Sequence, residues 1–167
     1  MRGHYTIHTV AILRNEIKMY GRFYIERDRL IQSYVKPLRE LYLKLFEIEQ
    51  KLILIKSPGK GNGLGGYVQE SDQRFNDLIQ KKENIRLKMT EYVLANRLQF
   101  MGEADEWNWR IATVEYYLSK LNDEDREFIN DLYVDHKIKF KDVMKKHRIK
   151  NEGNVSRKAN IILRKIL

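Results

Sequence analysis

Apolar residues recur at alternating steps of three and four along much of this chain, which is the spacing of one face of a helix. The longest such series runs from Leu38 to Ile55. After an interruption rich in glycine, residues 75–92 hold helical spacing again. We therefore predict two helices that pack along these stripes as a hairpin. The two stripes consist of Leu38, Leu41, Leu45, Ile48, Leu52 and Ile55, and of Phe75, Leu78, Ile85 and Tyr92.

The interruption, residues 57–71, contains Gly61, Gly63 and Gly66 in the spacing of a dinucleotide-binding loop. That fingerprint requires a β-strand before the glycines, whereas the residues that precede them belong to a helical stripe. A phosphate-binding P-loop is also absent, because no Gly-Lys pair is followed by Ser or Thr in the required frame. We interpret the segment as a loop that joins the two helices.

Two more stripes lie on either side of the hairpin. The spacing predicts a short helix within residues 9–24 and a linker helix near residues 107–121. A tryptophan in such a stripe is typical of core packing. The residues concerned are Val10, Leu13, Ile17, Tyr20 and Tyr24, and then Trp107, Ile111, Val114, Leu118 and Leu121.

Three short helices are predicted in the last part of the chain. Asn122 and the acidic residues 123–125 are typical of a helix N-terminus, because the side-chain oxygen caps the helix and the acids complement its dipole. Asn151 or Asn154 is expected to cap the last helix. The expected buried faces are Phe128, Ile129, Leu132 and Tyr133 in the first helix, Phe140, Val143, Met144 and His147 in the second, and Val155, Ala159, Ile162 and Ile166 in the third.

Three such helices with a turn before the last one indicate a helix-turn-helix module, whose final helix enters the DNA major groove. Arginine and asparagine can each make paired hydrogen bonds to a base edge, and lysine suits phosphates. On this interpretation the residues at the tip and outer face of the last helix are Asn154, Ser156, Arg157, Asn160, Ile161 and Arg164. The phosphate contacts are expected from Lys145, Lys146, Lys150, Lys158 and Lys165.

The charge distribution points to the same partner. Residues 136–167 hold eleven Lys or Arg against two Asp or Glu, and the preceding 135 residues are balanced, so the whole net charge of +9 lies at the C-terminus. Residues 101–135 are acidic, with a net charge of −7. A basic block of this kind favours double-stranded DNA as partner over a membrane surface.

The composition excludes several other classes. The chain has no cysteine, which rules out disulfides and thiolate zinc sites and fits the cytoplasm. No apolar run approaches the ~20 residues of a membrane span. No nucleophile elbow, kinase signature or metal-ligand spacing is present, so we expect no enzyme and no cofactor or metal.

The segment EDREFINDLYVDHKIKFKDVMKKHRI and the following NVSRKANIILRKIL resemble the promoter-reading C-terminal region of bacterial sigma factors. They are more similar to phage and prophage transcription regulators of the ArpU and RinA kind. Asp142-Val143 stands where that family has Glu-Ile, and Val155-Ser156 where it has Val followed by a polar residue. Arg148 stands where the family has glycine in a left-handed turn, and five residues rather than four separate Ile149 from Val155.

These observations predict an all-α protein with two domains. Residues 1–100 would form a heptad-bearing helical hairpin for interaction or dimerisation, with the Gly-rich loop at 57–71. Residues 101–167 would form the linker helix and the sigma-factor-like helix-turn-helix module. The resemblance implies a cytoplasmic, sequence-specific regulator that activates late phage or prophage genes and contacts host RNA polymerase.

Two alternatives stay open at the level of sequence. A phage DNA-packaging protein of the small-terminase kind also joins a helix-turn-helix to an oligomerising hairpin. A protein that binds RNA polymerase or a host factor through its acidic middle and heptad helices would need no DNA. The heptad seam fits either a homodimer or an intramolecular core.

Overall fold

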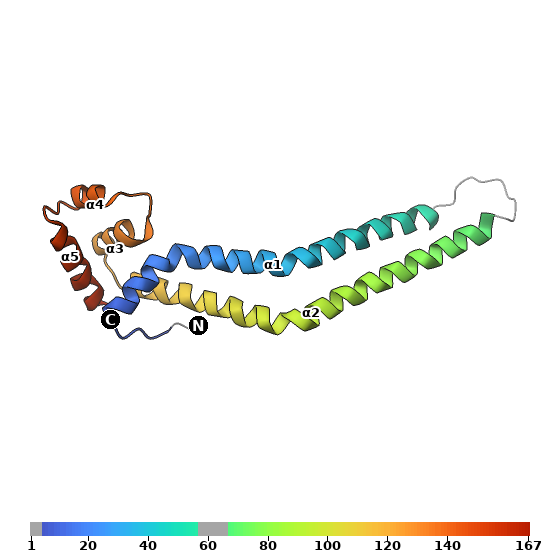
Figure 1. The fold of residues 1–167 in the computed structure, drawn as a ribbon, viewed down its shortest axis with the longest axis horizontal. Coiled ribbons are helices and arrows are strands. Elements are labelled where there is room, and N and C mark those ends of the chain that lie inside the picture. The colour runs from blue at the N-terminus through green and yellow to red at the C-terminus, as the bar shows by residue number, and fades with distance from the viewer. Residues whose placement is uncertain (1–4, 57–66) are drawn as a thin grey trace. The chain divides into compact units, whose positions relative to one another are not determined.

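The computed structural model describes residues 5–56 and 67–167. Two long helices, α1 (Val10–Lys56) and α2 (Tyr67–Ser119), precede four short elements (Figure 1). No strand occurs within the described ranges, and the expected all-α fold class is confirmed. The short elements are α3 (Asp123–Ile129), the π-helical segment η1 (Asn130–Val134), α4 (Phe140–Lys146) and α5 (Glu152–Lys165).

The contacts divide the chain into two compact units. Unit 1 consists of Met1–Arg29 and Glu103–Leu167, and unit 2 of Leu30–Gly102. This differs from the expected division at residue 100, because the N-terminal residues contact the C-terminal segment rather than the hairpin. The sequence could not indicate this, since the contacts join residues more than 100 positions apart, as in the bond from Ile7 N–H to the Tyr117 hydroxyl.

The first helix is longer than predicted. We expected a short helix within residues 9–24 and a separate hairpin helix, whereas α1 continues for 47 residues through Pro37. Proline lacks the N–H that would bond to the carbonyl four residues earlier, but the residues on both sides continue the same helix. The expectation of separate helices was therefore wrong.

The second helix also extends beyond its predicted ends. It begins at Tyr67, so the last five residues of the predicted loop 57–71 are helical. The rest of that loop, including its glycines, lies outside the described residues. The predicted linker helix is the last part of α2, because the helix continues without interruption to Ser119. None of the helices in the described ranges has an apolar stretch of membrane-spanning length.

Unit 2 is held together by the predicted seam. Ile48, Leu52 and Leu78 are buried between α1 and α2, and the other predicted seam positions are partly buried. Tyr34 of α1 stacks on Phe100 of α2 with ring centroids 4.1 Å apart. The heptad interpretation is therefore confirmed within this hairpin.

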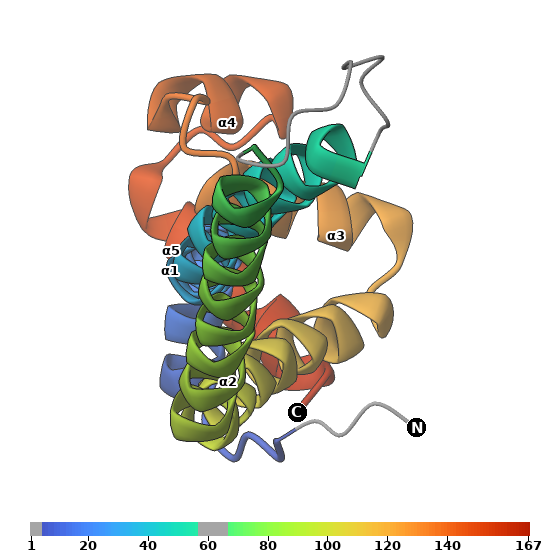
Figure 2. The same cartoon turned by 90° about the vertical axis from the view of Figure 1, so that its right-hand side faces the viewer.

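Unit 1 contains the larger core, which gathers side chains from every helix. Figure 2 shows the ribbon turned by 90°, with α3, α4 and α5 in orange to red. Leu13, Ile17 and Phe23 of α1 pack with Val114 of α2 and Phe128 of α3, and all five are fully buried. The predicted stripes in residues 9–24 and 107–121 supply much of this core. The N-terminal part of α1 therefore belongs to the same core as α3, α4 and α5.

Candidate nucleic-acid interface

The last helix, α5, begins directly after Asn151, which is one of the two residues expected to cap it. Asn151 is extended, and its Oδ1 accepts a hydrogen bond of 2.8 Å from the Gly153 N–H. This bond satisfies one of the free donors at the start of α5. Asn154 already lies within the first turn, with its N–H bonded to the Asn151 carbonyl at 3.0 Å. Asn151 is therefore the cap, and Asn154 is left at the tip of the helix.

The turn between α4 and α5 contains Arg148 in a left-handed conformation, with φ of 53°. The resemblance implied such a conformation at this position, where a residue with a side chain costs roughly 1 kcal/mol relative to glycine. The Ile149 N–H bonds to the Met144 carbonyl at 2.8 Å and closes the turn.

One face of α5 is anchored in the core. The predicted stripe of Val155, Ala159, Ile162 and Ile166 is buried, and Leu163 joins it. α4 contributes less, because only Val143 among its seven residues is fully buried. Phe140, which we expected on the buried side, is 41% exposed. It is the first helical residue, and its side chain lies outside the core.

The opposite face of α5 carries polar and basic side chains. Asn154, Ser156, Arg157 and Arg164 are exposed, as predicted. Ile161, between the two arginines on the same face, is 51% exposed. The side chains of the four polar residues form no hydrogen bond or ion pair with any described residue. They are available to a partner.

Asn160 occupies one edge of this face. Its side-chain oxygen accepts a hydrogen bond from the guanidinium of Arg14 in α1, and it is only partly exposed. At about 100° per residue, Asn160 is turned from the outermost position toward α1. The structure therefore gives the side-chain oxygen of Asn160 an internal partner, which sequence spacing could not reveal.

Lys158 occupies the other edge. Its ammonium lies 4.8 Å from the centre of the Phe128 ring and 3.9 Å from a carboxylate oxygen of Glu124, both in α3. Its side chain is one-third exposed. Lys158 therefore packs partly on the module itself, in addition to any contact with phosphate.

Lys146 is held by two carboxylates. Its Nζ lies 2.7 Å from Oε1 of Glu127 and 2.7 Å from Oδ2 of Asp131, and these hydrogen bonds raise the pKa of Lys146. Lys145 and Lys150 are exposed, without such partners among the described residues. Of the predicted phosphate contacts in and after α4, these two remain available. Lys165 lies 3.7 Å from Asp125 and is mostly exposed.

Asp131 lies at the centre of the contact between η1 and α4. Its Oδ2 is 2.8 Å from Nε2 of His147, whose ring stands edge-on to Phe128 at 5.0 Å. Burial disfavours the ionised carboxylate, but the hydrogen bonds with Lys146 and His147 outweigh this effect and lower the pKa of Asp131. The cluster fixes α4, and therefore the turn before α5, against η1.

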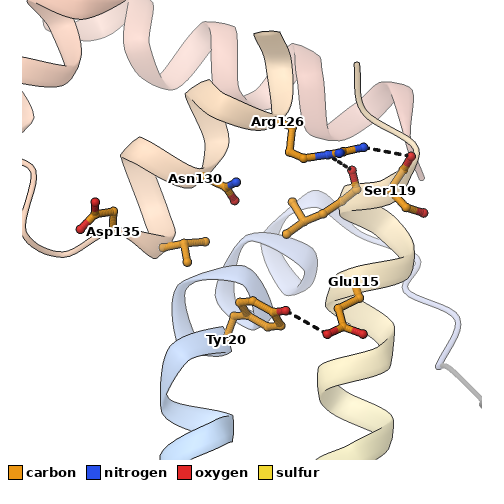
Figure 3. Close-up of a pocket in the computed structure, with 8 residues that line it drawn as sticks. Tyr20, Glu115, Ser119, Arg126, Asn130 and Asp135 are labelled. Atoms are coloured by element: carbon orange, nitrogen blue, oxygen red, sulfur yellow. Dashed lines mark hydrogen bonds between the residues drawn. The ribbon is translucent and has the colours of Figure 1, made fainter. Parts of the chain in front are cut away.

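An open pocket of about 440 Å³ lies on another part of unit 1, lined by residues of α1, α2, α3 and η1 (Figure 3). Arg126 bonds to the carbonyl oxygens of Leu118 and Leu121 at 3.1 and 3.0 Å, which caps the end of α2. Tyr20 donates to Glu115, and burial together with this acidic neighbourhood raises the pKa of the tyrosine. With Glu115 and Asp135 in its lining, the pocket is unsuited to phosphate.

No group of His, Asp and Glu in residues 5–56 and 67–167 is arranged to hold a metal ion. Comparison with family models, with curated proteins and with solved structures gave no match. The function must therefore be argued from the residues of this chain.

Proposed function

We propose that the protein is a sequence-specific double-stranded DNA-binding regulator of transcription, with α5 as the helix that enters the major groove. The observation that carries this proposal is the outward face of α5. It presents the side chains of Asn154, Ser156, Arg157 and Arg164, which have no hydrogen-bond or ion-pair partner among the described residues, on a helix whose other face is anchored in the core.

The chemistry of that face suits base recognition. Arginine can donate two hydrogen bonds to O6 and N7 of guanine, and asparagine can pair with N6 and N7 of adenine. Ile161 lies between the arginines and suits an apolar contact with a thymine methyl group. The 14 residues of α5 span about 21 Å, enough to follow the groove over several base pairs. We assign Asn154, Ser156, Arg157 and Arg164 to base contacts.

Charge supports the same assignment. Eleven basic residues against two acidic ones lie in residues 136–167. Lys145 and Lys150 are exposed on either side of the turn that leads into α5. They are suited to phosphate contacts that position α5 without reading sequence.

The wider role follows from the resemblance to phage and prophage regulators. On this proposal the protein is a cytoplasmic activator of phage or prophage genes, DNA is its main partner, and RNA polymerase is a second one. The long hairpin would serve association with a second copy or with another protein.

The test is binding of the full chain to duplex DNA from its own genomic neighbourhood, with a scrambled duplex as control, over a range of salt concentrations. We expect preference for one segment and a slope of log affinity against log salt near −0.9 for each phosphate contacted. Arg157→Ala should reduce that preference about 10-fold or more. Arg39→Ala, which removes an exposed arginine of α1 in unit 2, should change neither quantity.

Lys150→Ala should act differently from Arg157→Ala. It should weaken binding to all duplexes alike and make the salt slope shallower by about 0.9. Tight binding without any sequence preference, by a ring-shaped oligomer, would instead favour a DNA-packaging protein. No binding at low salt would contradict the proposal and favour a purely protein-binding role.

A further inference from the structure

The two flanks of the outward face of α5 differ in charge. At about 100° per residue, Lys158 and Lys165 lie roughly 100° and 80° from Arg157 on one side of the helix. Asn160 and Ser156 lie roughly 60° and 100° from Arg157 on the other side. That second flank holds no Lys or Arg of α5. One flank of the helix is therefore basic, and the other is neutral.

A helix in the DNA major groove meets phosphates on both flanks. The groove is about 12 Å wide, and a helix with its side chains is about 10–12 Å across. Such a helix fills the groove, so that its outermost residues reach the bases while its flanks face the two sugar–phosphate backbones. On the neutral flank of α5, the positive charge for one backbone has to come from another element.

The first helix supplies positive charge at this neutral flank. Nη2 of Arg14 donates a hydrogen bond to Oδ1 of Asn160, which places the guanidinium beside α5. Figure 1 shows the start of α1, in blue, next to α5, in red. Of the Arg14 nitrogens only Nε is buried without a bond, and Arg14 forms no ion pair with a described residue. Its Nη1 is therefore accessible to a partner.

Lys18 extends this charge by one helical turn. It lies four residues after Arg14, on the same side of α1, and it is exposed. Its ammonium lies 5.4 Å from the centre of the Tyr133 ring in η1. Apart from this ring contact, Lys18 has no hydrogen bond or ion pair with a described residue. Both basic side chains of α1 thus lie against the C-terminal module.

The one acidic residue in this part of α1 is turned away from the two cations. Glu16 is the only Asp or Glu in residues 5–25. It follows Arg14 by two residues, which is about 160° around the helix. Arg110 of α2 holds its carboxylate with hydrogen bonds of 2.7 and 3.2 Å. Glu16 therefore does not neutralise Arg14 or Lys18.

We propose that Arg14 and Lys18 contact the DNA phosphates along the neutral flank of α5. The inference rests on the DNA binding proposed above and adds the N-terminal helix to the surface that contacts DNA. Phosphate is the partner, rather than a base, because both cations lie beside α5 and not on its outer face. The bond to Asn160 holds the guanidinium in place before DNA binds, so that less side-chain freedom is lost in the complex.

The first test measures the affinity of the full chain for the genomic and the scrambled duplex over a series of salt concentrations. Lys18→Gln removes an exposed charge that has no hydrogen bond to a described residue. It should make the slope of log affinity against log salt shallower by about 0.9 and weaken both duplexes by the same factor. Lys18→Arg should keep the slope. Lys44→Gln, at an exposed position of α1 in unit 2, is the matched control and should change neither quantity.

A second pair of variants separates the charge of Arg14 from its support of α5. Arg14→Gln removes the charge and should also make the slope shallower by about 0.9. Asn160→Ala removes the acceptor but keeps the arginine, so it should weaken binding with the slope of the parent. A purely structural role of Arg14 would instead lower the affinity in both variants without changing the slope. Circular dichroism of each variant checks that its helix content is unchanged.

The outcomes separate this proposal from the DNA binding on which it rests. A parent chain that binds neither duplex at low salt contradicts both. If the parent binds with a steep salt slope while Lys18→Gln and Arg14→Gln keep that slope, the role of α1 is overturned and that of α5 stands. A slope that also becomes shallower in Lys44→Gln would show an effect of net charge and would overturn the assignment to these two residues.

Discussion

Arg14, in the second turn of α1, donates a hydrogen bond from Nη2 to Oδ1 of Asn160 in α5. The bond joins two residues 146 positions apart and ties the N-terminal helix to the proposed recognition helix. The Nε of Arg14 is buried without a hydrogen-bond partner, so the guanidinium relies on the side-chain oxygen of Asn160 as its acceptor among the described residues. We therefore regard Asn160 as a residue that positions α5.

Asn160→Ala should lower the free energy of unfolding by about 1–2 kcal/mol, because it leaves a partly buried guanidinium without its acceptor. Urea unfolding followed by circular dichroism measures this change. Ser156→Ala, at an exposed position of the same helix, should stay within about 0.5 kcal/mol of the parent. Asn160→Ala should also weaken binding of the protein to all DNA duplexes alike. A selective loss at one adenine would show instead that Asn160 reads a base.

The Asp131 cluster predicts a dependence of stability on pH. The pKa of Asp131 is lowered from its ordinary value of 3.8, so the carboxylate stabilises the folded state above that pH, and this contribution is lost as pH falls through the lower folded value. Lys146 and His147 contact Asp131 directly, and Glu127 shares the Lys146 ammonium.

Asp131→Asn should therefore cost about 1–3 kcal/mol at pH 7 and progressively less below about pH 4. Urea unfolding at a series of pH values measures the difference between parent and variant. Asp142→Asn, which changes an exposed acid of the neighbouring helix, is the matched control. A difference that stayed constant from pH 7 to pH 2 would contradict the role of the ionised carboxylate.

The left-handed turn predicts a stabilising substitution. Arg148→Gly should raise the free energy of unfolding by roughly 1 kcal/mol, because glycine adopts a φ of 53° without steric cost. Arg39→Gly, within α1, should lower it by about 1 kcal/mol, because glycine is unfavourable inside a helix. The same Arg→Gly substitution should thus change the free energy of unfolding in opposite directions at the two positions. Destabilisation by Arg148→Gly would mean that the side chain makes a compensating contact.

Pro37 predicts a second stabilising change. Pro37→Ala restores an N–H that can bond to the Ser33 carbonyl and should stabilise the hairpin by about 1–3 kcal/mol. The thermal unfolding midpoint is the measurement. Lys36→Ala, at the preceding exposed position, should change stability by less than about 0.5 kcal/mol. An unchanged midpoint for Pro37→Ala would indicate that packing of the proline ring stabilises the hairpin as much as the missing backbone hydrogen bond would.

Local patterns were sufficient for part of the architecture. The seam from Leu38 to Ile55, the cap at Asn122 and the buried stripe of α5 could all be read directly, because each depends on residues within a few helical turns. The Asn122 side chain does accept a bond from the Asp125 N–H, at 2.7 Å. The helices were predicted too short, since whether a helix continues through a residue such as Pro37 depends on the packing on both sides of it.

The sequence by itself determined that the chain is helical, that its basic charge lies at the C-terminus, and which face of α5 is buried. These properties follow from the periodicity of side chains and from composition. Only the tertiary structure decided that Asn160 is bound by Arg14, that Lys146 is engaged by Glu127 and Asp131, and that the N-terminal helix supports the C-terminal module. The physical reason is that these contacts join residues distant in sequence, and their partners are set by how the helices pack.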